Sequence, residues 1–116
     1  MPLVDVTYGS QVAEHDLQRL AKVLPHAVSL AVQCPEEPYD GALQPGDVEV
    51  RFHPRGPYDV AGLDLVVEVR SKWFSSREET RHERCEQLCD ALIEAAGTRS
   101  IGVYLSMPVA AWAQGT

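Results

Sequence analysis

The sequence is poor in cysteine and in basic residues, and it has no long hydrophobic run. Three cysteines among 116 residues are an odd number, which does not complete a disulfide framework. Ten lysines and arginines stand against 17 aspartates and glutamates, so the formal net charge is −7. Because an acidic chain is poorly suited to a phosphate backbone, we expect no nucleic-acid partner.

The chain also lacks the signals for membrane insertion and export. No apolar run approaches the roughly 20 residues that a membrane-spanning helix needs, so we expect no membrane partner. No basic segment followed by an apolar stretch opens the chain, so we expect no signal peptide. Reduced thiols in the cytoplasm are the simplest account of the cysteines.

The remaining composition is that of an ordinary globular protein, with 45% hydrophobic and 23% charged residues. We expect one domain over residues 1–116, with two halves of roughly 1–57 and 58–116. In the first half, residues 3–8 are predicted to form a strand, and Ser10 is predicted to cap a helix that Pro25 kinks or restarts. A loop over residues 34–46 then leads to an alternating strand over residues 47–53.

The second half repeats this order of elements. Residues 63–70 alternate as a strand, and Ser75 or Ser76 caps a helix with an apolar stripe. Gly97 stands where the helix should end, and residues 101–105 form a last strand. The expected fold is therefore α+β, a double β-α-β repeat with a four-stranded mixed sheet and two helices on one face.

Such a sheet leaves its other face uncovered, which favours oligomerisation. We expect this face to carry Glu49, Arg51, Glu68 and Arg70 among residues such as Val66 and Tyr104. That mixture suits a wet or ion-paired interface between subunits.

A proline directly after Met1, opening a strand of a β-α-β repeat of this length, resembles the tautomerase superfamily. Residues 2–8 (PLVDVTY) are similar to the first strand of its 5-carboxymethyl-2-hydroxymuconate isomerase branch, and residues 51–53 (RFH) to that branch's second strand. Residues 103–108 (VYLSMP) resemble the end of the cis-3-chloroacrylic acid dehalogenase and 4-oxalocrotonate tautomerase branches. The resemblance implies a homotrimer with active sites at subunit interfaces.

The resemblance makes Pro2 the catalytic candidate, once Met1 is removed. Its nitrogen would then be a secondary amine that takes a proton from a carbon next to a carbonyl and returns it elsewhere. An apolar pocket or a nearby cation favours the neutral amine. With Met1 attached, the nitrogen is an amide and cannot act as a base, and Pro2 would then simply start an edge strand.

Besides Pro2, further side chains are candidates for the site. Arg51 and Arg70 either grip a substrate carboxylate or pair with glutamates across a subunit seam, and Lys72 is a weaker candidate for the first role. Tyr104 aligns with an active-site tyrosine of the superfamily, and Trp112 either walls a pocket or anchors the tail. The expected substrate is a small anionic keto or enol acid.

Two departures from the superfamily pattern leave alternatives open. The arginine of a Gly-Arg-Ser before the second helix is missing or displaced to Arg77, and Ser106 stands where the dehalogenase branch has an acid. A hydratase like that dehalogenase, or a trimeric binding protein without catalysis, therefore remain as alternatives. Cys85 and Cys89 have no partner pair for a zinc site, and no glycine-rich phosphate loop is present, so we expect neither metal nor cofactor.

Overall fold

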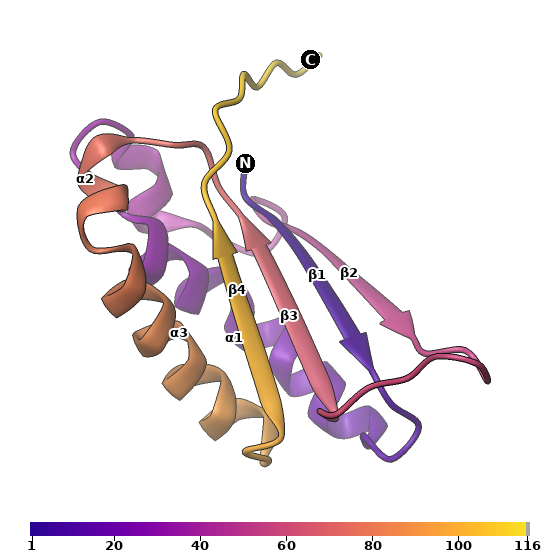
Figure 1. Ribbon diagram of the computed structural model, residues 1–116. Helices are drawn as coiled ribbons and strands as arrows, with labels where there is room; N and C mark the ends of the chain where they lie inside the picture. Colours follow the sequence, from indigo (N-terminus) through magenta and orange to yellow (C-terminus); the bar gives the residue numbers. More distant parts are fainter. Residues whose placement is uncertain (116) are drawn as a thin grey trace.

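The computed structural model describes residues 1–115 and consists of one sheet with helices on one side (Figure 1). In chain order, the elements are β1 (Leu3–Tyr8), α1 (Glu14–Val32), the 3-10 helix η1 (Pro38–Ala42), β2 (Glu49–Pro54), β3 (Leu65–Arg70), α2 (Ser75–Glu79), α3 (Arg81–Ala96) and β4 (Ile101–Ser106).

The sheet has the strand order β2-β1-β3-β4. β1 pairs in parallel with β2, β3 pairs in parallel with β4, and β1 and β3 are antiparallel. α1 and α3 cover one face of the sheet, and the opposite face stays open (Figure 1). The predicted fold class, a mixed four-stranded sheet with a double β-α-β arrangement, is confirmed.

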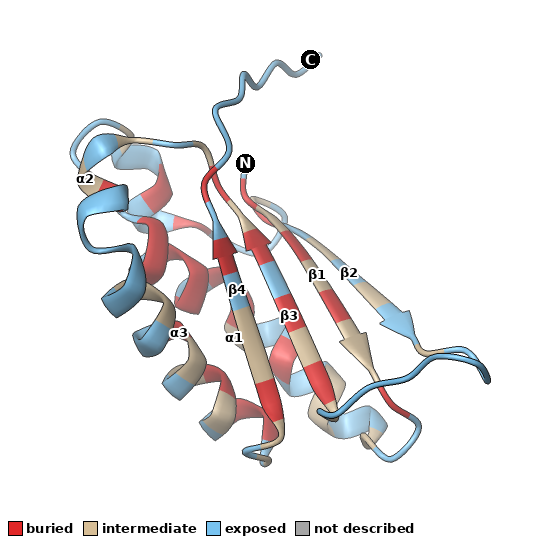
Figure 2. Ribbon diagram, viewed as in Figure 1, coloured by how far each residue is buried: buried red, intermediate tan, exposed pale blue. Residues whose placement is uncertain are grey.

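Alternation along the strands assigns side chains to the two faces. Val4 and Val6 of β1 are buried under the helices, and Val67 and Val69 of β3 join them in the core. The residues between them, such as Asp5 and Glu68, therefore lie on the open face. Figure 2 shows the resulting banding, with buried positions alternating along β1 and β3.

The first helix differs from the prediction in two ways. It begins at Glu14 after Ala13, which makes no side-chain cap, so the prediction of Ser10 as N-cap is wrong. Of the two outcomes predicted for Pro25, a kink or a restart, the restart does not occur, because one helix continues to Val32 with Pro25 buried inside it. The missing backbone N–H costs one helical hydrogen bond, and the packing of a long apolar face against the sheet outweighs it.

The second predicted helix is in fact two helices. α2 ends at Glu79 and α3 begins at Arg81, because Thr80 leaves the helical region with φ −118° and ψ 23°. Gly97 ends α3 with φ 69°, the left-handed conformation that glycine adopts without steric cost, as predicted. No helix among the described residues is long and apolar enough to cross a membrane.

Candidate functional site

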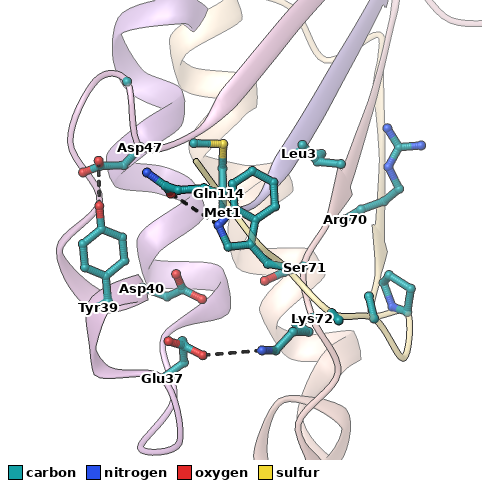
Figure 3. Close-up of a pocket in the computed structure, with 15 residues that line it drawn as sticks. Met1, Leu3, Glu37, Tyr39, Asp40, Asp47, Arg70, Ser71, Lys72 and Gln114 are labelled. Atoms are coloured by element: carbon teal, nitrogen blue, oxygen red, sulfur yellow. Dashed lines mark hydrogen bonds and ion pairs between the residues drawn. The ribbon is translucent and has the colours of Figure 1, made fainter. Parts of the chain in front are cut away.

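A cavity of about 610 Å³ opens at the sheet end where the chain starts (Figure 3). Four segments build it: the N-terminus, the end of β3, the loop containing η1, and the tail after β4. The tail contributes Pro108, Ala110, Ala111, Trp112 and Gln114. Residues far apart in the sequence thus share one concave site, the usual form of a small-molecule pocket.

The end of β3 contributes the basic side of the cavity. Arg70, Ser71 and Lys72 line it in succession. The Lys72 ammonium lies 4.0 Å from the Glu37 carboxylate across the cavity, and both side chains are partly exposed. An exposed pair at this distance is weak, so Lys72 stays available to an anionic ligand.

The loop contributes the Asp47 carboxylate, which already has hydrogen-bond partners within the loop. Asp47 accepts hydrogen bonds from the Tyr39 hydroxyl at 2.7 Å and from the Gln44 backbone N–H at 2.9 Å. These bonds hold the pKa of Asp47 below its usual value, with the Gln44 bond contributing most. The hydrogen bond to Asp47 correspondingly raises the pKa of Tyr39.

Arg77 is buried next to the cavity and holds several of its lining residues in place. Its side chain is fully buried and is not among the lining residues. It donates to Asp40 Oδ2 at 2.5 Å, to Ser71 Oγ at 2.9 Å and to the Lys72 carbonyl at 2.6 Å, and all three acceptor residues line the cavity. A further bond reaches the Val32 carbonyl at the end of α1, at 2.5 Å. Arg77 therefore ties the loop, β3 and α1 together.

Pro2 lies between two lining residues, Met1 and Leu3. Pro2 itself is buried, and its carbonyl accepts the Glu49 backbone N–H at 3.2 Å, which anchors this end of β1 to β2. The Met1 side chain lies in the cavity and is 40% exposed (Figure 3).

The other predicted site residues divide into two groups. Arg70, Lys72 and Trp112 line the cavity together. Arg51 and Tyr104 lie outside it on the open sheet face, where Tyr104 is 72% exposed. One chain therefore brings three of the six candidates into one cavity beside the N-terminal segment.

A cluster on the open face connects to the cavity through Arg70. The Asp5 carboxylate accepts a hydrogen bond from Arg70 Nη2 and lies 2.7 Å from His53 Nε2. Arg51 Nη1 is 4.0 Å away. The His53 bond, followed by the charges of Arg70, His53 and Arg51, lowers the pKa of Asp5 despite an opposing effect of burial.

Sequence reasoning missed two parts of this site. The loop carboxylates and Tyr39 belong to a segment whose prolines indicated only an irregular loop. Asp5 was also missed, although its place between Val4 and Val6 assigns it to the open face. His53, interpreted as a surface histidine at a strand end, is half exposed and pairs with Asp5.

None of the three cysteines lines the cavity. Burial raises the pKa of the Cys85 thiol, which donates to the Val103 carbonyl at 3.3 Å. Within residues 1–115, no group of histidine, cysteine, aspartate and glutamate side chains is arranged to hold a metal ion.

No family model and no curated protein sequence matches the chain. Solved structures do. A malonate semialdehyde decarboxylase superposes with a TM-score of 0.68 at 17% identity, covering 98% of this chain and 91% of the other. A 5-carboxymethyl-2-hydroxymuconate delta-isomerase gives 0.62 at 15%, covering 100% and 87%. A fused 4-OT described as a symmetric trimer gives 0.59 at 16%, covering 91% and 85%.

These structures belong to the tautomerase superfamily. At 15–17% sequence identity, the structural similarity establishes the fold alone. The chain has the tautomerase-superfamily fold, as its resemblance predicted. Proteins of different activities share that fold, so the reaction has to be argued from the site.

Proposed function

We propose that this protein is a tautomerase that moves a proton on a small keto or enol acid, with the Pro2 nitrogen as base. The observation that carries the proposal is that Met1 and Leu3, the chain neighbours of the buried Pro2, line the same cavity as Arg70 and Lys72. Removal of Met1 frees the Pro2 nitrogen and takes away a side chain that lies in the cavity. The Pro2 amine would then lie beside a cavity that two cationic side chains, Arg70 and Lys72, line.

Each side chain has a role in this proposal. Arg70 and Lys72 attract the substrate carboxylate and stabilise the enolate that forms when the α-carbon loses its proton. Trp112 forms an apolar wall from the tail, where it is 50% exposed. The five-membered ring of Pro2 limits the directions in which its nitrogen points, so little freedom is lost in aiming it at the substrate carbon.

Arg51 and Tyr104 take their proposed roles in an assembly. Both lie on the sheet face that no element of the described chain covers. In a homotrimer built through this face, they would reach the site from the subunit interface, where Tyr104 would polarise a carbonyl oxygen. The symmetric trimer among the structures of this fold supports the homotrimer.

The test of the proposal begins with the intact mass of the purified native protein. The proposal expects a mass without Met1, and a mass that retains Met1 would rule out the proline base. The same sample is then assayed for tautomerisation of phenylpyruvate.

The Pro2→Ala variant should lose activity by about 10²–10⁴-fold, the range that general acid–base catalysis contributes. Pro57→Ala is the matched control, because Pro57 is exposed in the loop between β2 and β3, away from the cavity. It should keep the parental rate. Equal rates for the parent and Pro2→Ala would contradict the mechanism.

A further inference from the structure

Asp5 lies at the centre of a group of basic side chains on the open sheet face. It belongs to the inner strand β1, opposite Arg51 on β2 and opposite Glu68 on β3. His53 and Arg70 are its diagonal neighbours, and such neighbours on one sheet face lie within reach of long side chains. The Asp5 carboxylate therefore interacts with three basic side chains. Its lowered pKa keeps it ionised at neutral pH.

Arg70 belongs both to this cluster and to the cavity. It lines the cavity, but its Nη2 donates to Asp5, which does not line it. Arg70 Nε is buried and has no hydrogen-bond partner among the described residues. A buried donor without a partner is unfavourable. If the Arg70 side chain turned from Asp5 into the cavity, an anionic ligand there would give this donor a partner and pair with the charge.

The Asp5 carboxylate does not depend on Arg70 alone. If Arg70 turned to a ligand, His53 would remain bonded to Oδ1 at 2.7 Å and Arg51 would remain 4.0 Å away. Removing the only partner of a partly buried charge is costly, but here partners remain. The arrangement thus lets Arg70 exchange one carboxylate for another.

We infer that Asp5 is the resting counter-ion of Arg70 and competes with the substrate carboxylate for it. Asp5 thereby sets how tightly the site holds an acid relative to a neutral analogue. This inference rests on the carboxylate-binding role that the proposed function gives to Arg70. It adds a specificity-determining residue that lies outside the cavity.

Two variants test the competition with effects of opposite sign. Asp5→Asn removes the competing charge and keeps the shape, so an acid should bind more tightly. His53→Ala removes another partner of Asp5, so Asp5 should hold Arg70 more firmly and the acid should bind more weakly. Each change in Kd should be about two- to five-fold, the range of a partly exposed ion pair. Damage to the fold would weaken binding in both.

Glu68→Gln is the matched control for charge. Glu68 lies opposite Asp5 on the same sheet face, is exposed, and is two residues from Arg70. Its substitution removes one negative charge without removing the partner that Arg70 has within the chain, so the Kd of the acid should stay within two-fold of the parental value. In an Arg70→Gln background, Asp5→Asn should no longer tighten binding.

The measurement is calorimetric titration, at neutral pH, with 3-phenylpropanoate and with its methyl ester. The inference expects the parent to prefer the acid, Asp5→Asn to increase that preference and His53→Ala to decrease it, with the ester unaffected. It is overturned if the parent shows no preference for the acid, or if Asp5→Asn leaves it unchanged or weakens it. A Glu68→Gln effect equal to that of Asp5→Asn would also overturn it.

The probe has no keto group and undergoes no tautomerisation. Loss of the proposed reaction in the Pro2 test would therefore leave this binding result intact. A failed competition would in turn leave the proline chemistry untouched. The two conclusions can fail separately.

Discussion

At the scale of single residues, a carboxylate acquires its pKa from the groups that the fold places beside it. Asp5 is held mainly by the hydrogen bond with His53 and then by the charges of Arg70, His53 and Arg51. Asp47 is held by a backbone N–H and a tyrosine hydroxyl. Both have a lowered pKa, but Asp47 lines the cavity together with its partner Tyr39, whereas Asp5 lies outside the cavity and reaches it only through Arg70.

The lowered pKa of Asp5 predicts how its contribution to stability depends on pH. A carboxylate with a folded-state pKa below its unfolded value stabilises the protein above the unfolded pKa, about 3.9, and the contribution is lost as pH falls through the folded pKa. The difference in unfolding free energy between the parent and Asp5→Asn should therefore be constant above about pH 5 and shrink below about pH 4. Thermal unfolding over a pH series measures it. A difference that grows toward acid pH would contradict the assignment.

At the scale of elements, one buried side chain holds together the segments that form the cavity. Arg77 bonds to the end of α1, to the end of β3 and to η1 through Asp40. The Phe74 ring adds a cation–π contact 5.0 Å from the guanidinium. The loop therefore keeps a defined position although much of it has no regular structure.

The Arg77–Asp40 pair predicts a large effect of breaking one side. Arg77→Met leaves the Asp40 carboxylate buried without its cation and should lower the free energy of unfolding by about 3–5 kcal/mol. The double variant Arg77→Met/Asp40→Leu should recover most of this loss, because a buried ion pair is replaced at little cost by apolar groups. Urea unfolding measures both. A single-variant loss below about 1 kcal/mol, the value of an exposed pair, would show that the pair is not buried in solution.

At the scale of the whole molecule, the sheet is covered on one side only. The open face carries charged residues with Val66 and Tyr104 among them, and the tail beyond β4 is exposed from Pro108 to Gly115. Trp112 and Val109 of this tail are half exposed and almost fully exposed. Both features favour the proposed association of copies of the chain.

Association through the open face predicts a species of three times the 12.8 kDa chain mass in sedimentation equilibrium. Val66→Lys places a charge at the middle of this face and should reduce the mass to that of a monomer, because an unpaired charge opposes burial. Leu30→Lys is the control, because Leu30 is 52% exposed on α1. It should leave the mass unchanged. A parental protein that sediments as a monomer would contradict the proposed trimer.

The features that the sequence predicted correctly are those that depend on local sequence patterns. The strand around Val4 and Val6 and the end of α3 at Gly97 were predicted, because alternation and a left-handed glycine are local properties. The start of α1 and the break at Thr80 were not predicted. Helix ends without a side-chain cap leave no sequence signal, and packing decides where the chain leaves the helix.

The sequence by itself determined the alternating strands, the two long helices and the mixed fold, because hydrophobic periodicity selects an element and the face that it buries. Only the tertiary structure decided which side chains meet. Arg70 lies 65 residues from Asp5, and Arg77 lies 37 residues from Asp40. No local pattern encodes such pairs, because each depends on strand register and on how a loop packs against the end of the sheet.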